Sequence, residues 1–225
     1  MDASFLRRNR LKTPVLIFLV LVHVAGALGL WHPESRAVFQ LLVPFSLLLS
    51  LGLVLIFHTE WNPAFFLFLI LTYLLGFLVE WAGVSTGVIF GSYHYDHALG
   101  FKYAEVPLVI GINWVLLIYC SGVIGGLFRS NTVRSFIGAL LMVCIDFLIE
   151  PVAMKYGFWS WKNDVVPLQN YLAWFVFSFV LLQIFFRLKF RKINLIAPLV
   201  YFLQLLFFTM LFLLSWFFPE PGSLF

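Results

Sequence analysis

The sequence predicts an all-α integral membrane protein with about seven transmembrane helices. Its 225 residues are 63% hydrophobic and only 11% charged, a composition far from that of a soluble domain. Apolar runs recur along the whole length, and they approach the ~20 residues of helix that a bilayer crossing requires. No polar stretch is long enough to fold alone. We therefore expect residues 1–225 to form a single transmembrane domain.

The first two helices are predicted from a basic start followed by two apolar runs. Arg and Lys residues up to Lys12 precede the first run. We expect that run to be a retained helix over 14–31, because no small-residue cleavage site of a signal peptide follows Leu30. Pro33 lies in a short predicted loop, and the second helix is expected over 37–57.

The remaining helices are expected over 64–83, 106–127, 135–153, 168–186 and 194–218, with a short tail after the last. Pro107 falls in the first turn of the fourth helix, where a missing backbone N–H costs little, and Pro167 opens the sixth. The third helix carries Glu80, whereas the fifth carries Asp146 and Glu150. The connection over 84–105 is part of the longest segment that is not continuously apolar.

Two stretches, 80–114 and 150–174, present the same features in the same order, which indicates an internal repeat. In each, a Glu is followed by an aromatic-Gly pair, and two further aromatic residues stand two and four positions after the Gly. Val-Pro-Leu and an Asn come next, and a Trp stands seven residues after the Pro. Coincidence in an aromatic-rich chain is the alternative. The repeat would pair the third and fourth helices with the fifth and sixth, with halves of about 64–127 and 135–186.

The basic residues predict an orientation in the cell membrane. If the N-terminus is inside, ten of the fourteen Lys and Arg residues fall in the inside segments and four in the outside segments. This bias favours a cytoplasmic N-terminus and an extracytoplasmic C-terminus, and it makes the repeat parallel, with both long connections on the outer face. Because the basic residues lie where a membrane protein places them, the net charge of +4 does not indicate binding to nucleic acid.

Three carboxylic acids, Glu80, Asp146 and Glu150, fall at membrane depth. A charged acid in hydrocarbon costs several kcal/mol, so we expect these side chains to face the protein interior. Asp146 and Glu150 are four residues apart and share one face of a helix. One protonated and one ionised carboxyl would serve as a general acid and a general base. A structural hydrogen-bonded pair is the alternative.

A second candidate is the pair His94 and His97, which a metal ion could use together with Asp96 or Glu80. We favour polar residues at the membrane interface for this pair and expect no metal. The aromatic residues that recur beside the acids also suit the interface, but their ring faces could stabilise a carbocation. These residues are Trp81, Tyr93, Tyr95, Trp114, Trp159, Trp161 and Trp174.

The sequence resembles the membrane-embedded carotenoid biosynthesis protein family over roughly residues 60–180. That family includes CruF-type carotenoid 1′,2′-hydratases and bisanhydrobacterioruberin hydratases. The first matching block contains Glu80, Gly91-Ser92-Tyr93-His94-Tyr95, Val106-Pro107-Leu108 and Asn113-Trp114. The second contains Asp146-x-x-x-Glu150-Pro151, Gly157-x-Trp159-x-Trp161 and Pro167-Leu168-x-Asn170.

The resemblance implies protonation of the terminal carbon–carbon double bond of an acyclic carotenoid end. Water would capture the resulting tertiary carbocation and give a tertiary alcohol, with no cofactor. The substrate would be a lipophilic carotenoid taken from membrane lipid, and other enzymes of the carotenoid pathway are candidate partners. We expect Glu80, Asp146 and Glu150 to be catalytic. The residues expected to bind water or substrate are Trp81, Tyr93, His94, Tyr95, Asn113, Trp114, Asn170 and Trp174.

Two other functions share some of these features. A carotenoid or lycopene cyclase would use the same protonation, although the sequence lacks a clear Pro-x-Glu-Glu run of the cyclase type. A transporter could instead relay protons through the acids. A retinal protein is disfavoured, because the predicted last helix over 194–218 contains no Lys for a Schiff base.

Overall fold

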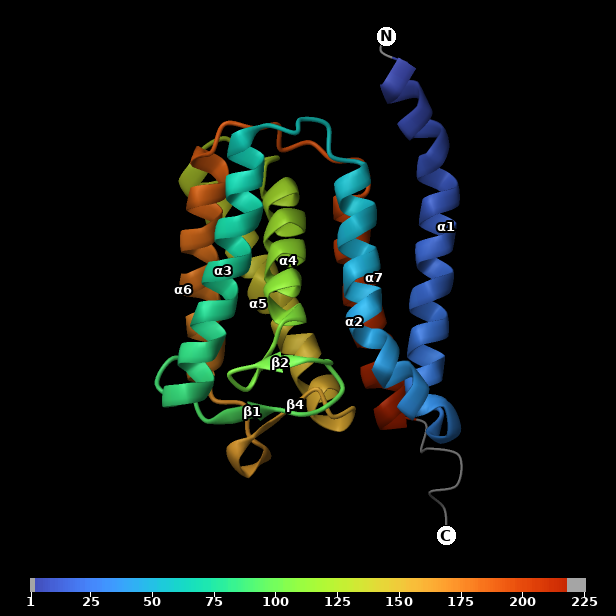
Figure 1. Ribbon diagram of the computed structural model, residues 1–225, viewed down its shortest axis with the longest axis vertical. Helices are drawn as coiled ribbons and strands as arrows, with labels where there is room; N and C mark the ends of the chain where they lie inside the picture. The colour runs from blue at the N-terminus through green and yellow to red at the C-terminus, as the bar shows by residue number, and fades with distance from the viewer. Residues whose placement is uncertain (1–2, 218–225) are drawn as a thin grey trace.

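The computed structural model describes residues 3–217, with side chains from Arg10 onward, and this part of the chain contains seven α-helices. They run in alternating directions as one bundle (Figure 1). Six are long and apolar enough to cross a membrane, which confirms an all-α integral membrane protein. The helices are α1 (Ala3–Trp31), α2 (Pro33–Ile56), α3 (Pro63–Thr86), α4 (Val109–Gly125), α5 (Asn131–Lys155), α6 (Leu168–Arg187) and α7 (Ala197–Phe217).

The start of the chain is more helical than the sequence suggested. Helix α1 begins at Ala3 and includes most of the basic segment that was expected to precede it. The loop predicted around Pro33 is reduced to His32, because Pro33 occupies the first turn of α2, where its missing N–H is not needed. Arg36 Nε donates to the Leu30 carbonyl (3.0 Å), and this bond satisfies part of the free end of α1. The predicted tail after α7 lies outside the described residues.

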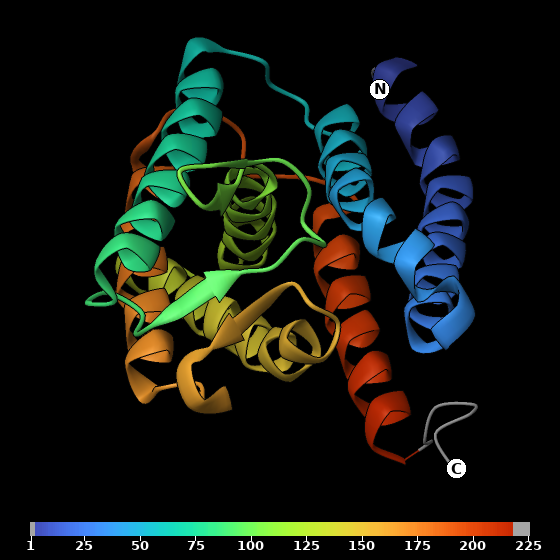
Figure 2. The same cartoon turned by 60° about the horizontal axis from the view of Figure 1, so that its bottom comes forward.

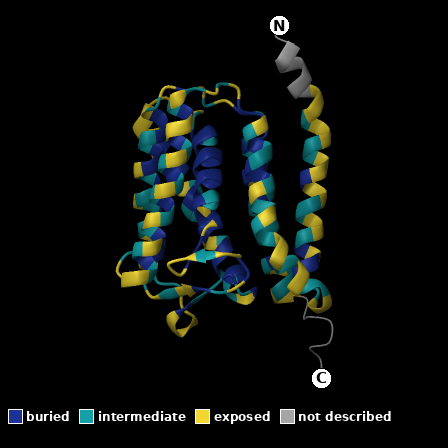
Figure 3. Ribbon diagram, in the orientation of Figure 1, coloured by how far each residue is buried: buried dark blue, intermediate teal, exposed yellow. Residues whose placement is uncertain are grey.

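Helix α4 forms the centre of the bundle. It contacts α2, α3, α5, α6 and α7, and fourteen of its 17 residues are buried (Figure 3). The prediction that this helix begins at 106 was wrong. Val106–Pro107 is instead the short strand β3, which pairs with β2 (Lys102–Tyr103). A proline before α4 therefore ends a strand pair, and the helix starts two residues later, at Val109.

The connections after α3 and α5 meet at one end of the bundle. Strand β1 (Tyr93–Tyr95) pairs antiparallel with β4 (Trp159–Trp161), and Tyr93 lies opposite Trp161 while Tyr95 lies opposite Trp159. Figure 2, which turns this end forward, shows the two strands side by side in front of the helices. Both connections thus lie on one face, as the repeat requires. These short strands were not predicted from the sequence.

Candidate functional site

The three acids meet in one small cavity between α3, α4, α5 and α6. Glu80 comes from α3, Asp146 and Glu150 come from α5, and each is less than 5% exposed. The cavity measures about 20 Å³, which is space for roughly one water molecule. Its other lining residues are Phe90, Tyr93, Tyr95, Ile110, Asn113, Trp114, Trp159, Trp161, Asn170 and Trp174.

Glu80 accepts hydrogen bonds on both carboxylate oxygens. Oε2 accepts from the Tyr93 hydroxyl (2.6 Å) and the Tyr95 hydroxyl (2.8 Å), and Oε1 accepts from Trp114 Nε1 (3.0 Å). The period of two along β1 places both tyrosines on the same face. Burial, and then the negative charge of Glu80, raise the pKa of both tyrosines above the usual value. Tyr93 and Tyr95 therefore stay protonated and act as donors.

Glu150 is held in a closely similar way. Its Oε2 accepts from Trp159 Nε1 (2.9 Å) and Trp161 Nε1 (2.6 Å), and its Oε1 accepts from Asn170 Nδ2 (3.2 Å). Indole N–H groups can only donate, so these contacts match an ionised carboxylate. Each glutamate thus receives two donors from an aromatic-x-aromatic strand and a third donor from the helix that follows.

Asp146 has a different environment from the two glutamates. Its Oδ2 accepts from Asn170 Nδ2 (2.8 Å), so the Asn170 amide bridges Asp146 and Glu150. Its Oδ1 is buried and has no hydrogen-bond partner within the described part of the chain. Three donors serve each glutamate and one serves Asp146. The carboxyl best suited to carry a proton in this cluster is therefore that of Asp146.

Aromatic rings form much of the wall around the acids. Trp114 and Trp174 stack with their ring centroids 4.5 Å apart, and Tyr93 lies 4.9 Å from Trp161 by the same measure. No Lys, Arg or His is among the residues that line this cavity in the described chain. The cavity can therefore act on a bound molecule through aromatic ring faces, hydrogen-bond donors and carboxyl groups.

Two residues that the sequence analysis placed in the site lie outside it. The His94 side chain is 70% exposed, and its Nε2 is 3.4 Å from Asp96 Oδ1. It points away because alternate residues of a strand face opposite sides, and its neighbours Tyr93 and Tyr95 face the cavity. Trp81 is 45% exposed, since it follows Glu80 by ~100° around α3. Among the described residues, no group of three or more His, Cys, Asp or Glu could hold a metal.

The remaining expected residues line the cavity, and the structure adds Trp159 and Trp161 as ligands of Glu150. Their signal was present in the sequence, because they correspond to Tyr93 and Tyr95 in the repeat pattern. They were named among the aromatic residues beside the acids whose ring faces could stabilise a carbocation, but they were not expected as hydrogen-bond donors to Glu150. Phe90, which also lines the cavity, belongs to the aromatic-Gly pair of the repeat, whereas Ile110 carries no sequence signal of this kind.

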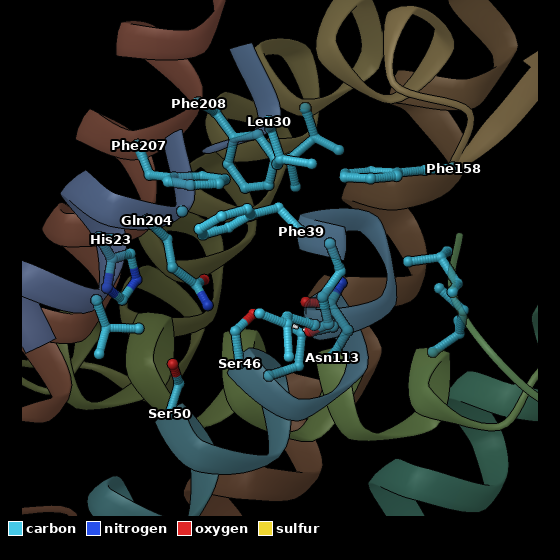
Figure 4. A pocket seen from close by; sticks show the side chains of 18 of the residues that line it. His23, Leu30, Phe39, Ser46, Ser50, Asn113, Phe158, Gln204, Phe207 and Phe208 are labelled. Atoms are coloured by element: carbon cyan, nitrogen blue, oxygen red, sulfur yellow. Dashed lines mark hydrogen bonds between the residues drawn. The ribbon is translucent and has the colours of Figure 1, made fainter. Parts of the chain in front are cut away.

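A larger cavity adjoins the acids. It measures about 150 Å³, its lining is mostly apolar, and it lies between α1, α2 and α7 on one side and α4 and α5 on the other (Figure 4). It shares Ile110, Asn113 and Trp159 with the acid-lined cavity. A hydrocarbon group in the larger cavity would therefore border the small cavity that the carboxyls line.

The comparisons with known proteins agree on one family. The family model described as "Carotenoid biosynthesis protein" matches residues 38–223. The chain is also 27% identical over 120 residues to "Bisanhydrobacterioruberin hydratase" of Haloarcula japonica, a match that covers 48% of this chain and 40% of that relative. The matched part thus spans less than half of the relative's own length. No solved structure matches the chain. Because the family model covers most of its length, the chain belongs to the carotenoid biosynthesis protein family.

Proposed function

We propose that this protein is a carotenoid hydratase that adds water to the terminal carbon–carbon double bond of an acyclic carotenoid end. The observation that carries the proposal is the unequal supply of hydrogen bonds to three buried carboxyls. Two are matched as carboxylates, and the third, Asp146, has an oxygen without a partner. The cluster thus offers one acid and two bases in the same cavity, and hydration through a carbocation requires one of each.

In the first step, Asp146 donates its proton to the less substituted carbon of the terminal alkene. A C–H bond forms, the O–H bond of the acid breaks, and the positive charge develops on the tertiary carbon. Asp146 is left as a carboxylate. The negative charges of Glu80 and Glu150 and the faces of Trp114 and Trp174 favour this cation.

In the second step, a water molecule forms the C–O bond at the tertiary carbon. One of the ionised glutamates accepts the proton that the water loses, and that proton restores the acid form of Asp146. The sum is the addition of one water, with no oxidation or reduction. The cavity has space for about one water, so bulk water is kept from the acid and from the cation.

The larger cavity supports an isoprenoid end as the reacting group. A cavity of ~150 Å³ can take a molecule the size of benzene, so it could hold the branched end of a carotenoid and not the whole molecule. The rest of the polyene would extend between the helices into lipid. The lipophilic substrate and the membrane location of the protein agree with this arrangement.

A pigment analysis tests the proposal. The full chain would be expressed in a host that accumulates lycopene. The extracted carotenoids would be separated by chromatography, and their masses would be measured by mass spectrometry. Hydration adds the mass of one water for each end that reacts. Cyclisation would change the chromatographic retention without changing the mass, and a transporter would leave the carotenoid chemically unchanged. Either of the last two results would reject the hydratase.

A matched pair of variants ties the activity to the acid. Asp146→Asn keeps the shape of the side chain and removes its proton, so the hydrated carotenoid should be lost. Glu105→Gln makes the same kind of change at an exposed position outside the cavity and should leave the product unchanged.

A further inference from the structure

The larger cavity contains polar groups that the proposed hydration does not use. Gln204 from α7 is 5% exposed and Ser50 from α2 is 3% exposed, and both line the cavity. Neither side chain forms a hydrogen bond within residues 10–217. An amide and a hydroxyl that line a cavity without protein partners can each bind a polar group that enters it.

A third polar group from α1 completes the set. His23 Nδ1 is 2.8 Å from the Leu19 carbonyl oxygen, which can only accept. The proton of the neutral ring therefore resides on Nδ1, and Nε2 is left as an acceptor. In Figure 4, His23, Ser50 and Gln204 lie on one side of the cavity and Phe158 lies on the other. The three polar residues come from three different helices, and these helices contact one another.

The donor and acceptor inventory indicates a neutral ligand group. Gln204 offers donors and an acceptor, Ser50 offers one of each, and His23 offers an acceptor. Of the described residues that line this cavity, none is Lys, Arg, Asp or Glu. A carboxylate or phosphate would have no opposite charge there, whereas a hydroxyl, which donates one hydrogen bond and accepts others, fits the three side chains.

We infer that His23, Ser50 and Gln204 form a polar subsite that binds a hydroxyl carried by the isoprenoid end group. The inference rests on the proposed function for the identity of the ligand's hydrocarbon part. It adds that the preferred ligand already bears an oxygen near the alkene. The apolar lining holds the hydrocarbon, and the subsite fixes how far the end group enters the cavity.

Two short isoprenoids provide a matched probe. Linalool and citronellene share one carbon skeleton and both of their carbon–carbon double bonds, and they differ only in the tertiary hydroxyl of linalool. Binding would be followed by the change in tryptophan fluorescence of the full chain in lipid nanodiscs, since Trp159 lines the cavity. Each ligand is compared between variants, so its partition into the lipid cancels.

The expected result is selective. Gln204→Leu, which keeps the side-chain volume, should weaken linalool binding by about fivefold, the factor for one ordinary hydrogen bond, and leave citronellene binding unchanged. Ser50→Ala should act in the same direction and provides a second variant if Gln204→Leu does not fold. Ser46→Ala is the matched control, because Ser46 lines the same cavity but its Oγ already donates to the Val43 carbonyl (2.8 Å).

The subsite is rejected if Gln204→Leu and Ser50→Ala change both ligands by the same factor or change neither. This outcome differs from failure of the proposed function, because binding requires no turnover. Selective loss of linalool binding in a protein that hydrates neither lycopene nor a carotenoid whose end group bears a hydroxyl would retain the subsite and remove the hydratase. Hydration of a carotenoid by a protein whose variants bind linalool and citronellene with equal changes would retain the hydratase and reject the subsite.

Discussion

Asp146→Asn is the sharpest test of the acid, because the structure separates its effect on catalysis from its effect on folding. The carboxyl receives one hydrogen bond, from Asn170, and its other oxygen has no partner in the described chain. An asparagine keeps the acceptor for Asn170 and places its NH₂ group at the vacant side. We therefore expect the free energy of unfolding to change by less than about 1 kcal/mol.

The catalytic loss should be much larger. A positioned general acid contributes ~10²–10⁴-fold, so hydration should fall by at least ~100-fold, which corresponds to about 3 kcal/mol of activation free energy. The assay is the initial rate of lycopene hydration in membrane vesicles, separated by chromatography and normalised to the amount of folded protein. Asp146→Asn hydrating lycopene within threefold of the parent rate would refute the assignment of the proton donor.

A parallel Glu80→Gln variant serves as a contrast in the same assay. In the parent protein, Tyr93, Tyr95 and Trp114 all donate hydrogen bonds to the Glu80 carboxylate. The NH₂ group of the glutamine is itself a donor, so at least one of these three residues would lose its acceptor. Each buried donor left without a partner costs about 1–3 kcal/mol. Glu80→Gln should therefore lower the thermal midpoint in detergent as well as the activity, whereas Asp146→Asn should lower the activity alone.

Three further predictions follow from the same structure. Trp161→Phe removes one donor from Glu150 and keeps most of the ring, so hydration should fall about tenfold while membrane levels stay near the parent, as an immunoblot would show. His94→Ala should leave the hydration rate within twofold of the parent, because the side chain is exposed; a loss above tenfold would return it to the site. A reporter fused after residue 225 should behave as extracytoplasmic, and cytoplasmic activity would reverse the orientation.

The gathering of the acids was predictable from the sequence, and their surroundings were predictable only in part. Glu80, Asp146 and Glu150 are too costly to expose to lipid, so burial against one another's helices was the expected solution. The errors at His94 and Trp81 share one cause. Each is the sequence neighbour of a residue that faces the cavity, but alternation along a strand and rotation around a helix turn neighbours away.

The larger cavity could not be predicted, for a different reason. Helices α1, α2 and α7 carry no recognisable motif, and the space between them depends on how apolar side chains pack. A lone Gln204 in an apolar helix gives no hint of which helices surround it. The start of α4 was predicted wrongly because a proline such as Pro107 can occupy either the first turn of a helix or the end of a short strand. The pairing of β3 with β2 is what distinguishes the two, and it is not visible in the sequence.

The close approach of α4 to α3 has a consequence for the way the site arose. On the proposed repeat, the position that corresponds to Asp146 is Gly76, four residues before Glu80. A Cβ atom at Gly76 would lie 2.6 Å from the Trp114 side chain, so no acid can stand there while Trp114 reaches Glu80. Duplication of a helix pair would thus have supplied two glutamates that each receive three donors, and the departure from symmetry at Gly76 and Asp146 would have supplied the proton. The proposed hydration needs a proton donor beside a proton acceptor, and that inequality would provide both.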